Sequence, residues 1–113
     1  MTRQEARVFA DRLRDAVVEA CGGETAGWCQ ATAEAVVLLV PGATTYHGGY
    51  DGTYDQAHTI ARVGDWYIDV TADQFGGPAV VVTDRLAGKY ADFAAERTCH
   101  PAAAARQIAS LVS

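Results

Sequence analysis

Two segments near the start of the chain have the apolar spacing of helices. Over residues 3–21, apolar side chains recur every three or four positions with charged ones opposite, and Thr2 and Glu5 have the spacing of a capping box. From Trp28 to Leu39 the chain is apolar on almost all sides, and Thr25 or Gly27 is placed to cap this segment. These patterns predict one amphipathic helix and one largely buried helix.

The middle of the chain changes to the patterning of strands. Residues 43–56 are rich in glycine and tyrosine and predict a weak strand with a long polar loop. Residues 57–63 and 66–71 read as strands, and the Gly64-Asp65 dipeptide between them suits a tight hairpin. A short β-branched run over residues 79–83 predicts a further strand.

The last part of the chain returns to helical character over residues 90–97 and 101–112, with Pro101 in the first turn of the second segment. The order of helices, then strands, then helices predicts a single α+β domain over residues 1–113. A chain of this size buries roughly two thirds of the surface that its unfolded form exposes. We therefore expect it to fold without a structural metal or disulfides.

Charge and hydropathy narrow the expected partners and location. The formal net charge is −5, and Lys and Arg are scattered along the chain, which argues against nucleic acid or an anionic membrane as a partner. The longest apolar run, residues 35–40, is too short to span a bilayer. The first residues are polar where a secretory signal needs an apolar stretch. We expect a cytoplasmic protein, with export as an effector without a cleavable signal as the alternative.

The chain has three cysteines, an odd number that argues against a disulfide framework, although Cys21 and Cys99 could pair in an exported protein. Cys29 differs from both because it falls in the first turn of the buried helix, where unpaired N–H groups and the helix dipole favour a thiolate. It shares a helix face with Ala33 and Val36, so we expect the thiol to point toward the domain. The simplest interpretation of Cys29 alone is an inert buried cysteine.

The predicted hairpin adds two more reactive groups. If Gly64 and Asp65 form a two-residue loop, His58 and Asp69 project from one face of neighbouring strands as diagonal neighbours. A carboxylate so placed fixes the tautomer of the imidazole and stabilises its charged form. The opposite face is almost wholly apolar and reads as core, with Ala61, Val63, Trp66, Ile68 and Val70. By itself the pair could simply close the hairpin; together with Cys29 it supplies the three roles of a catalytic triad.

These segments resemble the papain-like cysteine enzyme superfamily in its transglutaminase-like branch. The resemblance covers about residues 25–76 and rests on Gly27-Trp28-Cys29 opening a buried helix, His58 on a strand, and Asp69-Val70-Thr71 on the next strand after a tryptophan. It implies a buried helix bearing Cys29 packed on a small antiparallel sheet, with Cys29, His58 and Asp69 as catalytic triad. It also implies acyl transfer without a cofactor, most simply hydrolysis of an amide bond in a peptide or protein by a peptidase or glutamine deamidase.

Two positions depart from the pattern of that branch. Ile60 stands where an aromatic residue is common, and the oxyanion glutamine upstream of the cysteine is absent. The backbone N–H of Cys29 supplies one oxyanion donor, and four side chains are candidates for the second or for substrate binding: Trp28, Gln56, Gln74 and Tyr46. The departures favour the alternative function, a catalytically inactive papain-like scaffold that binds proteins.

The substrate and the remaining polar residues are less sharply defined. Peptidases, deamidases, transglutaminases and amide-forming transferases share the same triad, and so small a domain suggests a peptide or protein substrate supplied by a partner protein. His47, Asp51 and Asp55 lie before the His58 strand, but no pair has the spacing of zinc ligands, so we expect no metal. His100 is expected at a helix cap or on the surface.

Overall fold

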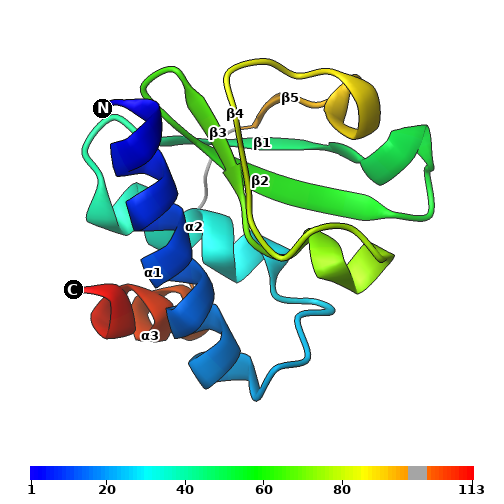
Figure 1. Cartoon of the computed structure of the whole chain (residues 1–113). Helices are drawn as coiled ribbons and strands as arrows, with labels where there is room; N and C mark the ends of the chain where they lie inside the picture. Colours follow the sequence, from blue (N-terminus) through cyan, green and yellow to red (C-terminus); the bar gives the residue numbers. More distant parts are fainter. Residues whose placement is uncertain (97–101) are drawn as a thin grey trace.

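The computed structural model describes residues 1–96 and 102–113 and has an α+β architecture (Figure 1). Three helices lie on one side of an antiparallel five-stranded sheet with the strand order β4-β3-β2-β1-β5. The helices are α1 (Arg3–Cys21), α2 (Cys29–Leu39) and α3 (Ala103–Val112). The strands are β1 (Thr44–Gly49), β2 (Ala57–Val63), β3 (Trp66–Asp69), β4 (Val81–Thr83) and β5 (Ala94–Glu96). Short 3-10 turns connect them: η1 (Tyr50–Gly52), η2 (Ala72–Phe75) and η3 (Gly88–Tyr90).

The first two helices form where the apolar spacing predicts them. Thr2 Oγ1 accepts from the N–H of Glu5 at 3.1 Å, and Glu5 Oε1 accepts from the N–H of Thr2 at 2.8 Å, which completes the capping box of α1. The N-cap of α2 is Trp28, which makes no side-chain cap, so the prediction of Thr25 or Gly27 as cap is wrong. Because no side chain caps α2 among the residues described, the N–H groups of its first turn are left for another acceptor.

The hairpin that carries the candidate site has the predicted register. Val63 pairs with Trp66 and Ala61 with Ile68, so Gly64 and Asp65 form a two-residue loop. Gly64 has a φ of 58°, the positive value that the first central residue of a type II′ turn requires. Continuing this register puts His58 and Asp69 on the same face of the sheet, as predicted.

The two faces of the sheet are covered by two separate apolar clusters. The helices cover one face, where the buried side chains include Leu13 and Val17 of α1, Val36 of α2, Ile108 of α3, and Ala61, Val63, Ile68 and Val70 of the hairpin. Trp66 is partly exposed and donates its Nε1–H to the carbonyl of Met1. The opposite face is covered by loop residues, and its cluster comprises Tyr50, Ile60, Ala72, Tyr90 and Phe93. The candidate His58–Asp69 pair therefore lies on the loop-covered face.

The end of the chain departs from prediction. The helix predicted over residues 90–97 is wrong within the described residues, because η3 ends at Tyr90 and strand β5 begins at Ala94. β5 pairs with β1, with Ala94 opposite His47 and Glu96 opposite Thr45. Alanines favour a helix locally, but the otherwise open edge of β1 offers backbone partners that outweigh this propensity. The expectations for Cys99, His100 and Pro101, and for a Cys21–Cys99 pair, lie outside the described residues.

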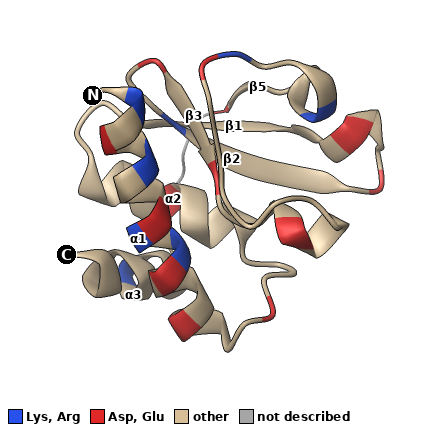
Figure 2. Cartoon of the chain, viewed as in Figure 1, with Lys and Arg blue, Asp and Glu red and all other residues tan. Residues whose placement is uncertain are grey.

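Charged residues of both signs lie on α1, and those of the loops are mostly acidic (Figure 2). The strands of the sheet are mostly uncharged in the same view. Within residues 1–96 and 102–113, no helix is both long enough and apolar enough to cross a bilayer.

Candidate active site

The centre of the site is a buried hydrogen bond between the two strands of the hairpin. His58 near the start of β2 and Asp69 at the end of β3 are joined by a 2.8 Å contact between Nε2 and Oδ2. The His58 side chain is 0% exposed and that of Asp69 is 2% exposed. A carboxylate that accepts from Nε2 fixes the ring orientation and leaves Nδ1 as the nitrogen available for proton transfer.

Two further groups hold Asp69 in place. The hydroxyl of Tyr90 donates to Asp69 Oδ2 at 2.6 Å, and the backbone N–H of Thr71 donates to Oδ1 at 3.0 Å. The Thr71 hydroxyl adds a weaker contact with Oδ1 at 3.4 Å. Burial, followed by the charge and hydrogen bond of Asp69, raises the pKa of Tyr90, so its phenol stays protonated and keeps donating. Both carboxylate oxygens of this buried Asp69 are therefore satisfied, as a buried charge requires.

Aromatic rings surround the imidazole on the loop-covered face. Tyr50, Phe75 and Phe93 lie edge-on to the His58 ring, with centroids 5.8, 5.0 and 6.1 Å away. The ring nitrogen Nδ1 is buried, and no well-formed hydrogen bond satisfies it among the described residues. Rings that exclude water strengthen each electrostatic interaction of His58 and leave Nδ1 without a solvent partner.

The thiol of Cys29 lies close enough to His58 for each group to shift the pKa of the other. Cys29 is the first residue of α2, and its side chain is partly exposed. Burial raises the pKa of the Cys29 thiol. The hydrogen bond and charge of His58 and the backbone N–H of Thr59 lower that pKa by more than burial raises it, so the net pKa is below that of a free thiol. Because Asp69 occupies Nε2, Nδ1 is the nitrogen left for Cys29. In unliganded enzymes such a hydrogen bond is often loose and tightens when substrate binds.

The charge state of His58 follows from the same contacts. Burial lowers its pKa, but the hydrogen bonds and charges of Asp69 and Cys29 outweigh burial and raise the pKa to about 9. The lowered Cys29 pKa and the raised His58 pKa both favour a thiolate beside an imidazolium over the neutral pair. This arrangement provides a nucleophile together with an acid that can protonate a leaving group.

The four candidate oxyanion or substrate-binding side chains lie in different settings. Trp28 directly precedes Cys29 in the chain, at the N-cap of α2, and is partly exposed. Gln74 donates its side-chain amide to the carbonyl of Thr71 at 2.9 Å. Gln56 ends the loop before β2, two residues from His58, and is partly buried.

Tyr46 lies on the His58 face of the sheet but toward the other end of β2. It pairs with Ile60, its hydroxyl accepts from Arg62 at 3.2 Å, and its ring packs edge-on against Tyr67. Of the four, Trp28 and Gln56 are therefore close in sequence to Cys29 and His58, respectively. The polar groups of Gln74 and Tyr46 are hydrogen-bonded to other partners.

Sequence reasoning missed the residues that support the triad. Thr71 belongs to the Asp69-Val70-Thr71 segment. Its place two residues after Asp69 is a local signal for a contact between the Asp69 side chain and the Thr71 backbone. Tyr90 lies 21 positions from Asp69 in a segment predicted as helix, and no local pattern indicates their contact. The rings of Phe75 and Phe93 likewise reach His58 only through the folding of the loops.

A second polar chain runs beside Cys29 on the helix-covered face. His47 Nδ1 lies 3.0 Å from Thr59 Oγ1, which donates to Gln30 Oε1 at 3.3 Å, and Gln30 donates to Glu34 Oε2 at 3.1 Å. Since Thr59 donates to Gln30, it accepts from His47, which places a proton on His47 Nδ1. This chain fixes His47 and the first turn of α2 relative to β2.

In the described part of the chain, no group of three or more His, Cys, Asp or Glu side chains is placed to hold a metal ion. Comparison with known protein families, curated proteins and solved structures found no match to this chain.

Proposed function

We propose that this protein is a cysteine-nucleophile acyl-transfer enzyme that hydrolyses an amide bond in a peptide or protein, with Cys29, His58 and Asp69 as its triad. The observation that carries the proposal is the buried His58, whose Nε2 is bonded to Asp69 and whose Nδ1 is left for a thiol of lowered pKa. We further propose that the fold is papain-like in its transglutaminase-like form, with a Cys-bearing helix packed on the His- and Asp-bearing strands.

A purely structural role for the His58–Asp69 hydrogen bond, in which it only closes the hairpin, accounts poorly for this geometry. A structural His58–Asp69 bond would satisfy both partners, yet Nδ1 is buried without a well-formed partner. An unsatisfied buried polar atom costs about 1–3 kcal/mol and is found where chemistry requires it. The lowered pKa of Cys29 depends on this same imidazole.

The proposed reaction uses the three side chains of the triad, the backbone N–H groups at the start of α2, and water. The Cys29 thiolate adds to the amide carbonyl, and the negative charge on the oxygen is stabilised by the free N–H groups at the start of α2. The His58 imidazolium then transfers its Nδ1 proton to the departing amine or ammonia, and the C–N bond breaks to leave a thioester. Water attacks the thioester while neutral His58 accepts its proton, which releases the acid and restores the thiolate–imidazolium pair.

A second candidate function, a protein-binding module on the same scaffold, is favoured by one observation. The Cys29–His58 contact does not include a well-formed hydrogen bond to Nδ1 in this unliganded geometry. In a binding module the contact would stay loose in every state, and Cys29 would form no covalent intermediate.

The experiment that separates the candidates is product analysis by mass spectrometry. A mixture of synthetic peptides containing Gln and Lys is incubated with the protein and with Cys29→Ala. A peptidase gives new termini, a deamidase gives a gain of about one mass unit at Gln, and either leaves an acyl adduct on Cys29 after acid quenching. Identical peptide masses with both proteins, and no adduct, would contradict enzymatic function.

A further inference from the structure

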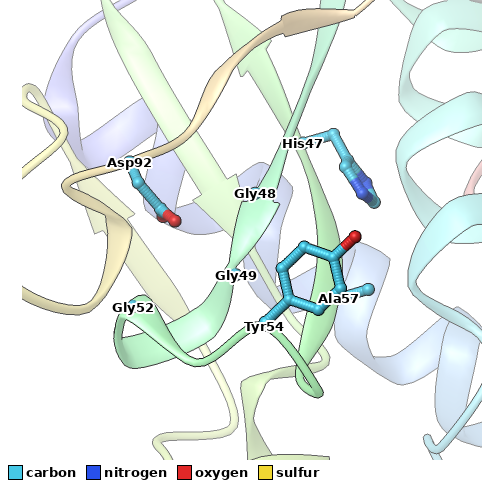
Figure 3. A pocket seen from close by; sticks show the side chains of 7 residues that line it. All are labelled: His47, Gly48, Gly49, Gly52, Tyr54, Ala57 and Asp92. Atoms are coloured by element: carbon cyan, nitrogen blue, oxygen red, sulfur yellow. The ribbon is translucent and has the colours of Figure 1, made fainter.

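A pocket of about 510 Å³ lies at the end of β1 (Figure 3). Figure 3 shows His47, Tyr54 and Ala57 on one side of Gly48 and Gly49, with Asp92 on the other. The pocket adjoins the triad through two short links. Gly48 pairs with His58 across β1 and β2, and Ala57 directly precedes His58. The pocket therefore borders the backbone of the residue that carries the imidazole, whereas the His58 side chain itself points to the opposite face of the sheet.

On its Asp92 side, the pocket reaches a gap in the ladder between β1 and β5. The two strands pair from Thr45–Glu96 to His47–Ala94 and then separate. Two positions further along this register, Asp92 would lie opposite Gly49. There, however, the N–H of Phe93 donates to the carbonyl of Tyr90 in a turn, and β5 has not yet begun. The edge of β1 is thus paired along its first half, Phe93 packs against Gly48, and the ladder is missing at Gly49.

The backbone groups of Gly49 face this gap. The N–H of Tyr50 donates to the carbonyl of Gln56 on the β2 side at 2.9 Å. Because backbone groups of successive residues in a strand alternate between its two neighbours, the N–H and C=O of Gly49 point to the β5 side, where the ladder is missing. An unpaired strand edge of this kind offers one donor and one acceptor to an incoming chain.

The glycines themselves have a structural reason. A Cβ at Gly48 would lie 2.7 Å from the Phe93 ring, and a Cβ at Gly49 would lie 2.7 Å from the carbonyl oxygen of Thr53. Close packing therefore requires both glycines, whatever the pocket does. Both glycines therefore contribute only backbone atoms to the lining of the pocket.

We propose that an extended segment of the peptide substrate enters this gap and pairs with Gly49 as an added strand, with a basic side chain beside Asp92. The proposal rests on the proposed function, since it delivers a scissile amide to Cys29. Strand addition at an open edge fits the donor and acceptor that Gly49 presents. Asp92 is exposed, and no ion pair neutralises it in the described part of the chain. Tyr54, 96% exposed at the rim, adds an aromatic surface of the kind enriched at recognition sites.

The test changes the ligand rather than the glycines, because side chains at Gly48 or Gly49 would disturb packing. Short peptides that end in a vinyl sulfone, and carry one Lys, are made with each backbone nitrogen methylated in turn. Inactivation of Cys29 is measured as a second-order rate constant and divided by the rate with iodoacetamide. We expect a loss of about tenfold at one nitrogen, the effect of one backbone hydrogen bond, and little effect at the neighbouring nitrogens.

The charge part of the inference is tested on the protein. Replacing Lys by norleucine in the peptide should slow inactivation by about two- to fivefold, as for an exposed ion pair. This preference should shrink in Asp92→Asn and persist in Asp65→Asn, a matched control in the hairpin loop. Equal rates across the methylated series, or no peptide reaction while iodoacetamide reacts rapidly, would overturn the inference and leave the proposed function standing. A thiol that is inert to iodoacetamide near neutral pH would overturn both.

Discussion

Asp69 Oδ2 lies 2.8 Å from His58 Nε2, and the hydroxyl of Tyr90 lies 2.6 Å from the same oxygen. This oxygen therefore has one neutral donor and one imidazole as partners, in a buried site. Its negative charge is balanced when His58 is protonated, which is why the pKa of His58 rises despite burial. The account of the site depends on this coupling, because the imidazolium in turn stabilises the Cys29 thiolate.

Cys29→Ala should abolish turnover while preserving the fold. Ala keeps the first residue of α2 helical and removes only the sulfur that forms the thioester. Cys21→Ser is the matched control, because Cys21 ends α1 and its thiol is partly exposed without a helix N-terminus beside it. The two variants are compared by peptide mass analysis and by circular dichroism. Loss of turnover in folded Cys21→Ser, with turnover retained in Cys29→Ala, would mean that the wrong nucleophile is named.

Tyr90→Phe should lower stability by about 1–3 kcal/mol, because a hydrogen bond to a buried carboxylate is removed and Asp69 is left with one fewer donor. Tyr54→Phe is the control, since Tyr54 is 96% exposed and should change stability by less than about 0.5 kcal/mol. Urea unfolding of both variants at one pH measures the difference. Equal unfolding midpoints would show that the Tyr90–Asp69 contact does not stabilise the site.

Asp73 should make stability depend on acid pH. Arg14 binds both carboxylate oxygens at 2.8 and 2.9 Å and Thr25 donates to one of them, so the Arg14 hydrogen bond, ahead of opposing burial, lowers the pKa of Asp73. A lowered pKa adds stability above the unfolded value of about 3.9, and that stability is lost as the pH falls through the folded pKa.

Asp73→Asn should therefore unfold at lower urea than the wild type at neutral pH, by about 1–3 kcal/mol, and the gap should narrow below about pH 4. Asp11→Asn removes an exposed pair with Arg7 and should cost less than about 1 kcal/mol. A gap that is constant from neutral pH to about pH 2 would contradict the role of the Asp73 charge.

The sequence was informative where local rules decide structure. The capping box fixed the start of α1, and Gly64-Asp65 fixed the hairpin register from which His58 and Asp69 share a face. It was uninformative where distant segments compete. The alanines of β5 prefer a helix, and only the edge of β1 makes them a strand.

The support of the site was beyond local reasoning for the same reason. Tyr90 reaches Asp69 because η3 folds over the sheet, and the ring of Phe93 reaches His58 through the turn that precedes β5. Such contacts depend on long-range packing, which periodicity along one segment does not encode.

The most direct test of the coupling is the rate at which iodoacetamide alkylates Cys29, measured from about pH 4 to pH 10 in the wild type and in Asp69→Asn. In the wild type the lowered Cys29 pKa should give a plateau of reactivity well below pH 8.5, about the pKa of a free thiol. In Asp69→Asn the imidazolium loses its partner, so the His58 pKa should fall and the reactive plateau at low pH should shrink.

Removing the Asp69 charge also acts on the thiol directly, but this influence on the Cys29 pKa is smaller than that of His58, so the loss of the imidazolium should prevail. Cys21 in the same protein serves as internal control, and circular dichroism checks the folding of Asp69→Asn. We predict a wild-type curve with a plateau below about pH 7 that is reduced in the variant. If the wild-type curve shows a single titration near pH 8.5, that result by itself would contradict the account, because Cys29 would then have no imidazolium partner.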